Sequence, residues 1–229
     1  MVKLLLPTVI IGIYALDPKF DLLDTRGIHS SVAASEFAAG TYGSWNIRMS
    51  DQERKNEGPV GASAIEGIFP LTGLQEGIYF EYLAHLNAPR NSTELPPYNE
   101  QFICTIRGDL DPAILERAWN DLAARHSALR TAFTQAPGKG LLQIVLKARP
   151  VSFLFNNISE NGDIEETCRT IAREYRSRPF DLARESLLRV CLLRTATANH
   201  RLIFTFHHLI ADAWCGPILF EDLMALYAS

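Results

Sequence analysis

The chain has 229 residues, of which 47% are hydrophobic and 21% charged, which is the composition of an ordinary globular protein. This length corresponds to between one and two average domains and is enough to bury a substantial core, which excludes a disordered or fibrous chain. The net charge of −4 argues against nucleic acid or an anionic membrane as the main partner.

The first 63 residues are predicted to form a leader or linker that is poorly ordered. Residues 4–16 make a short apolar run that resembles the core of a signal peptide but is too short to cross a bilayer as a helix. No convincing cleavage site follows, so a buried strand or a misassigned start of the reading frame is favoured over export. Residues 17–63 show neither a strand nor a helix period. The folded domain is therefore placed at residues 64–229.

Four helices are predicted where a capping residue or a proline precedes an apolar stripe. Two begin with a capping box, in which the cap residue and a residue three positions later bond each other's backbone. Another carries proline directly after an aspartate, at the first helical position. The four start signals are Thr72–Gln75, Asp111–Pro112, Asp163–Glu166 and Pro217.

Strands are predicted between these helices by short apolar or alternating runs. The turn 137–140 (PGKG) joins two of them as a hairpin. Alternation of helices and strands predicts an α/β fold with a mixed sheet and helices packed on one face. The predicted strands are residues 102–107, 129–135, 141–147, 187–194 and 201–207.

The four cysteines are predicted to be free thiols, because they form no Cys-x-x-Cys pair and lie at no metal-ligand spacing from a histidine. Neither a zinc site nor a disulfide framework is expected, and free thiols favour a cytoplasmic location. The cysteines are Cys104, Cys168, Cys191 and Cys215.

The segment RLIFTFHHLIADAW, residues 201–214, carries the candidate chemistry. His207 and His208 are adjacent at the end of a predicted strand, so their side chains point to opposite faces and only one can serve a given site. Asp212 follows where a carboxylate can hold a loop by pairing with a distant cation, which leaves one imidazole as a base. From the residues alone, two ordinary core or edge histidines remain the main alternative. A metal site is disfavoured because the histidines diverge and no fourth ligand is evident.

HHLIADAW resembles the His-His-x-x-x-Asp-Gly signature of the condensation domains of non-ribosomal peptide synthetases, in the chloramphenicol-acetyltransferase-like superfamily. Four further segments resemble motifs or blocks of this family, in the family's order. The resemblance implies a chloramphenicol-acetyltransferase-like lobe, the first of the two that form the family's domain. The four segments are FPLTGLQEGIYF (69–80), RGDLDPAILERAWNDL (107–122), RHSALRTAF (125–133) and RPFDLARESLLRVCLLR (178–194).

The resemblance implies a role for each polar residue of the signature. His208 is the catalytic histidine, which removes a proton from the α-amine of the acceptor, or positions that amine, as the nitrogen attacks a thioester. His207 is structural. Asp212 pairs with an arginine of the second motif, with Arg130 as the first choice and Arg125 as the second.

The three positions after Asp212, and His126 in another segment, carry further expectations. Trp214 is expected to pack under the loop, without a chemical role. Ala213 stands where the family has glycine, which is harmless unless its φ is positive. Cys215 stands where the family has serine. Its position near the site is explained by this replacement as well as by a covalent role. His126, at the end of a helix, is expected to be a cap or core residue rather than a catalytic one.

The function implied by the resemblance is amide-bond formation between carrier-bound acyl or aminoacyl thioesters, by a half domain that lacks its second lobe. Its partners would be carrier proteins whose phosphopantetheine arms present the substrates, and a separate second lobe or downstream synthetase domains, with no nucleic acid, membrane or permanently bound cofactor. Without the second half of the tunnel, poor catalysis by this chain alone is expected. Two alternatives stay open, a free-standing coenzyme A-dependent acyltransferase and an orphan lobe that docks a carrier protein without catalysis.

Overall fold

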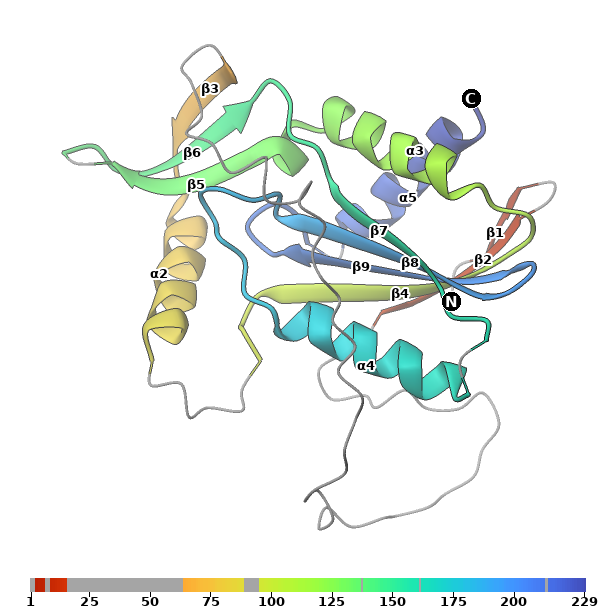
Figure 1. The fold of residues 1–229 in the computed structure, drawn as a ribbon. Helices are drawn as coiled ribbons and strands as arrows, with labels where there is room; N and C mark the ends of the chain where they lie inside the picture. Colours follow the sequence, from red (N-terminus) through yellow and green to blue (C-terminus); the bar gives the residue numbers. More distant parts are fainter. Residues whose placement is uncertain are drawn as a thin grey trace, which may run out of the picture.

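A computed structural model describes residues 3–6, 9–15, 64–88, 95–136, 138–160, 162–212 and 214–229. These residues form an α/β fold, as predicted, with two sheets and helices packed on them (Figure 1). The strands are β1 (Lys3–Leu6), β2 (Val9–Ala15), β3 (Ile65–Pro70), β4 (Asn99–Arg107), β5 (Thr131–Ala136), β6 (Gly140–Leu146), β7 (Ser152–Asn157), β8 (Leu188–Ala196) and β9 (Asn199–His207). The helices are α2 (Gly73–Asn87), α3 (Pro112–Arg125), α4 (Ile164–Ser177) and α5 (Cys215–Tyr227), and a 3₁₀ turn spans Ser127–Arg130.

The larger sheet is mixed and has the order β1-β2-β4-β9-β8-β7. Only β7 and β8 pair in parallel, and a parallel pair needs a long crossover, which α4 provides. β9 lies between β4 and β8, and its register with β4 places Asn99 opposite His207. The first residues of β4 therefore lie beside the last residues of β9.

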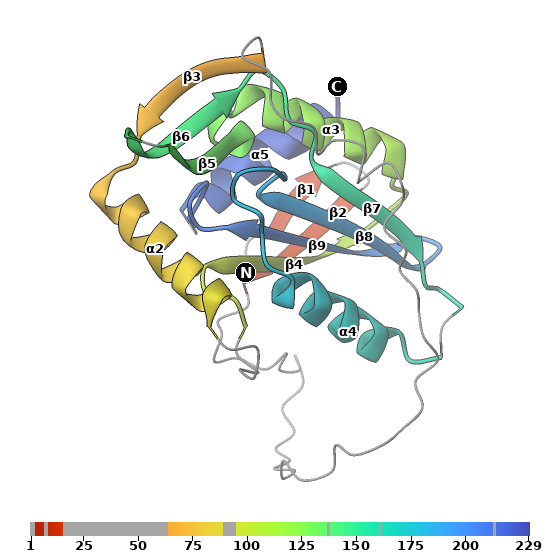
Figure 2. The ribbon, with the colours of Figure 1, turned by 60° about the vertical axis from the view of Figure 1, so that its left-hand side comes forward.

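Helices cover both faces of this sheet, not one face as predicted (Figure 2). α3 and α5 pack together on one face, where Phe204 belongs to their apolar cluster. α4 lies on the other face, where Ile203 and Ile171 share a second cluster. Successive apolar residues in β9 make both faces of the strand apolar, so both must be covered.

The smaller sheet has the order β3-β6-β5 and stands beside α2 (Figure 1). The β5–β6 hairpin turns where predicted, with Gly138 and Gly140 at φ of 72° and 78°, a region that favours glycine. α2 begins at the predicted capping box of Thr72 and Gln75. Of the helices that the structure describes, none is long and apolar enough to cross a membrane.

Part of the predicted leader, residues 3–6 and 9–15, forms strands of the larger sheet, and a strand is one of the two alternatives that the sequence favours for residues 4–16. β1 and β2 form an antiparallel pair, and β2 pairs with β4 along the edge of the larger sheet. The β-branched and aromatic run VIIGIYA suits a strand, and the β4 edge provides unpaired backbone groups for it. The other residues of the predicted leader, 1–2, 7–8 and 16–63, lie outside the described residues.

Candidate functional site

His207 ends β9 with its ring inside the core. Its side chain is fully buried and meets the ring of Tyr82 edge-on, with 4.5 Å between the ring centroids. Nδ1 accepts the backbone N–H of Leu209 at 3.2 Å. Burial, and secondly the charge of the neighbouring His208, lowers the pKa of His207 to about 3. A neutral ring without access to solvent fits a structural role.

His208 leaves the strand and reaches the surface. Its backbone N–H donates to the carbonyl of Tyr98 at 2.9 Å, and the two rings stack with 6.3 Å between centroids. One third of the side chain is exposed, whereas Nδ1 is shielded from solvent and makes no hydrogen bond. The acidic neighbour of Nδ1 is Glu100, whose Oε1 lies 3.9 Å away. The two histidines thus differ in exposure, with His207 buried and His208 at the surface in the turn after the strand.

Tyr98 adopts a backbone conformation that side chains disfavour, with φ at 64°. This left-handed region costs a residue other than glycine roughly 1–2 kcal/mol. Sparsely populated conformations of this kind are concentrated at functional sites. Here the conformation brings the Tyr98 carbonyl to the backbone N–H of His208 and its ring against the imidazole.

Asp212 holds the loop by bonds to its own segment. Its Oδ1 accepts the backbone N–H groups of Trp214 and Cys215 at 3.0 and 3.1 Å, and the Cys215 thiol at 3.2 Å. These bonds, the thiol's first among them, lower the pKa of the Asp212 carboxyl group. The carboxylate therefore shapes the turn that leads from β9 into α5.

The predicted pairing of Asp212 with Arg130 or Arg125 is wrong in this structure. Arg130 is buried and pairs with Glu66 of β3 at 2.7 Å, while its Nε donates to a carbonyl of α3. Arg125 pairs with Asp222 of α5 at 3.3 Å. The 3₁₀ turn between α3 and β5 directs Arg130 towards the smaller sheet, so Glu66 is the carboxylate that it meets.

The structure also bears on the expectations for the remaining predicted residues. Trp214 is 86% exposed, so the expectation that it packs under the loop is wrong. Ala213 lies outside the described residues. Burial raises the pKa of the Cys215 thiol, which disfavours the thiolate that a covalent role needs. His126 ends α3 and contacts Asp222 of α5 at 2.7 Å, a capping and packing position.

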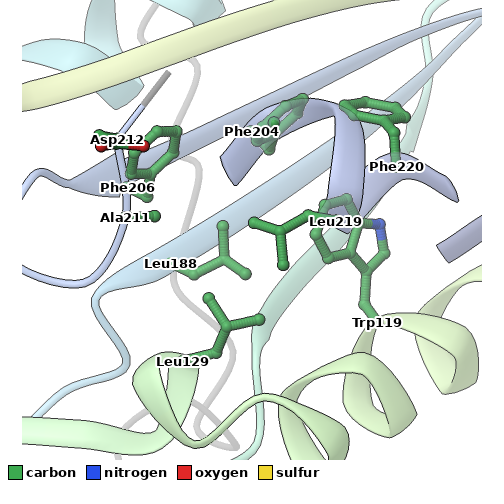
Figure 3. Close-up of a pocket in the computed structure, with 10 residues that line it drawn as sticks. Trp119, Leu129, Leu188, Phe204, Phe206, Ala211, Asp212, Leu219 and Phe220 are labelled. Atoms are coloured by element: carbon green, nitrogen blue, oxygen red, sulfur yellow. The ribbon is translucent and has the colours of Figure 1, made fainter. Parts of the chain in front are cut away.

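Neither of two cavities formed by the described residues contains His208. An apolar cavity of about 10 Å³ lies between α3, α5 and the sheet, with Asp212 at one side (Figure 3). This volume holds at most about one water molecule. A more open cavity of about 410 Å³ lies between α2 and residues 179–185. Both cavities lie away from the partly exposed side chain of His208.

Sequence reasoning missed three residues around the histidines, Tyr82, Tyr98 and Glu100. The signal for the last two is the register of β4 on β9, which requires knowing that these strands are neighbours. Within the described ranges, no group of three or more His, Cys, Asp or Glu side chains is arranged to hold a metal ion.

Comparison with known proteins connects this geometry to a family. The model of the condensation domain matches residues 65–229. The chain is 31% identical over 195 residues to bacitracin synthase 3 of Bacillus licheniformis, covering 84% of this chain and 3% of the synthase. It is 33% identical over 167 residues to tyrocidine synthase 2 of Brevibacillus parabrevis, covering 72% of this chain and 4% of that synthase.

A solved structure shares the fold. The starter condensation domain of rhizomide synthetase RzmA superimposes with a TM-score of 0.64 at 20% identity, over 71% of this chain and 38% of the other. The chain thus spans a small part of the synthases and less than half of the starter domain. Because the family model matches well over half of its residues, the chain belongs to the condensation-domain family.

Proposed function

We propose that the chain is the N-terminal lobe of a condensation domain that joins two carrier-bound acyl or aminoacyl groups through an amide bond. His208 would act as the general base or positioning group for the acceptor amine. The observation that carries the proposal is the contrast between His208, which is partly exposed, and His207, which is fully buried with a pKa lowered to about 3.

The proposed reaction places one proton on His208. The amine nitrogen attacks the thioester carbonyl, a C–N bond forms, and the amine proton passes to the imidazole. The C–S bond then breaks, and the departing thiolate recovers the proton. Carrier proteins would present both substrates on phosphopantetheine arms, so the chain itself needs no bound cofactor. The buried free cysteines Cys104, Cys168 and Cys191 support a reducing, cytoplasmic location.

The proposal includes a second lobe over the His208 surface, from a separate chain or a downstream segment. Trp214 and Ile218 are 86% and 60% exposed at the start of α5, next to the Asp212 turn. Large apolar side chains that stand in water beside a site mark a surface for a partner. The share of 38% that the chain covers in the RzmA starter domain leaves room for such a lobe. A non-catalytic docking lobe is the second candidate, because the isolated site is open.

The test is amide formation between a donor-loaded and an acceptor-loaded carrier protein, with and without a separately expressed second lobe. Product is expected only when the second lobe is present. Turnover of roughly 1 s⁻¹ or more by the chain alone would contradict the need for it. Product from a coenzyme A thioester but not from a loaded carrier would favour the free-standing acyltransferase. Carrier binding without product in every mixture would favour the docking lobe.

A further inference from the structure

We infer that Glu100 is a positioning residue for His208, holding a proton on Nδ1 so that Nε2 is the basic nitrogen. The inference deepens the proposed function and rests on it, because it assigns a second residue to the same site. Glu100 lies on β4, outside the segment that contains the two histidines, and is brought to the site by strand pairing.

The geometry around Nδ1 carries this inference. Nδ1 is excluded from solvent and has no hydrogen-bond partner, and Glu100 Oε1 lies 3.9 Å away. A shift of about 1 Å would bring the two atoms to hydrogen-bond length. Catalytic hydrogen bonds are often long in an unliganded site and shorten when the complex forms. Nε2, on the opposite side of the ring, is then the nitrogen left for a substrate.

Other charged groups near His208 are engaged elsewhere. Asp212 lies in the loop after β9, and its Oδ1 accepts the backbone N–H groups and the thiol described above. Glu81 of α2 accepts the hydroxyl of Tyr98, whose ring stacks on His208. His207 points into the core. Among the residues with described side chains, Glu100 is the carboxylate within 4 Å of the His208 ring nitrogens.

The chemistry follows from the two nitrogens of a neutral imidazole, one of which donates while the other accepts. A carboxylate that accepts from Nδ1–H fixes which tautomer is present and how the ring is oriented. The same carboxylate stabilises the imidazolium that forms when Nε2 takes the amine proton. Glu100 would thus act through His208 and need not touch the substrate.

The experiment measures the tautomer of His208 in the full chain by nitrogen NMR, at a pH where ordinary histidines are neutral. The His208 signals are assigned by their loss in His208→Ala. The wild type is expected to carry its proton mainly on Nδ1, and Glu100→Leu mainly on Nε2. Glu100→Gln, which keeps an acceptor oxygen, should give a smaller change in the same direction. The matched control is Glu81→Leu, which removes the carboxylate partner of Tyr98 and should leave the tautomer unchanged.

A wild-type proton on Nε2, or no tautomer change in either Glu100 variant, would overturn the inference. If Glu100→Leu does not fold, Glu100→Gln decides. A tautomer change of equal size in Glu81→Leu would assign the effect to Tyr98 instead. In the assembly with the second lobe, Glu100→Leu should lower turnover by about tenfold with KM unchanged. If the Glu100 variants change the tautomer of His208 but His208→Ala stays fully active, the proposed function is refuted. The inference that Glu100 positions His208 would then still hold.

Discussion

His207 and His208 are neighbours in the chain, but their side chains differ in burial and in contact with solvent. The His207 region is part of the core, where Tyr82 and Phe180 surround a neutral ring. His208 is one third exposed; the turn after it returns residues 209–211 to the core, and Trp214 beyond the turn is again exposed. One strand end therefore places one histidine in the core and the next at the surface.

The contrast separates a finished core from an open surface. The core around β9 is finished within the chain, since both faces of the sheet are covered. The surface around His208 is more open, since His208 lines neither of the two cavities formed by the residues that the structure describes. We expect changes on the two sides of this boundary to separate stability from activity, and the predictions below test that separation.

The largest expected loss of stability comes from His207→Ala. The variant leaves a cavity beside Tyr82 and removes the acceptor of the Leu209 N–H, which should lower the free energy of unfolding by about 3 kcal/mol. His208→Ala is the matched control, and its loss should stay below about 1 kcal/mol because the ring is partly exposed. Urea unfolding of both variants measures the difference. Equal losses would remove the distinction between the two regions.

The next largest effect is on the pH dependence of stability. The pKa of His207 is about 3 in the folded chain against an ordinary value of 6.5, so between these values only the unfolded state binds the proton. The contribution of neutral His207 to the free energy of unfolding is fully present above pH 6.5 and is lost progressively as the pH falls towards 3. The loss at pH 5 relative to pH 7 should be about 2 kcal/mol. It is measured as the difference between wild type and His207→Leu, because burial also lowers the pKa of His200. Parallel pH profiles for the two proteins would contradict the buried, neutral ring.

The smallest effect is expected from Asp212→Ala. Asp212 is exposed, and its described hydrogen bonds go to Trp214 and Cys215 close by in the chain, so the melting temperature should change much less than in His207→Ala. Arg130→Met, which removes a buried charge from its partners, should instead lower the melting temperature strongly. A loss from Asp212→Ala as large as that from Arg130→Met would mean that Asp212 has a buried partner after all.

Local signals predicted much of the fold. The starts of α2 and α3 follow from Thr72–Gln75 and Asp111–Pro112 because a capping bond joins residues two or three positions apart. Strand alternation predicts that His207 and His208 face opposite sides, but it does not account for their placement here, because His208 already lies in the turn after β9.

Features decided by distant segments were not predicted. β7 was missed, because its parallel pairing with β8 spans a whole helix. The place of β2 at the β4 edge and the partner of Arg130 also depend on which segments meet in three dimensions. Glu100 was missed for the same reason, since only the register of β4 on β9 brings it to His208.

The most direct test of the central claim is turnover by the two histidine variants in the assembly with the second lobe. His208→Ala should lower turnover by about 10²–10⁴, the usual contribution of a positioned general base, with little loss of stability. His207→Leu, normalised to its folded fraction, should keep turnover near the wild-type value. An inactive but stable His207→Leu, together with an active His208→Ala, would contradict the assignment of the reactive histidine.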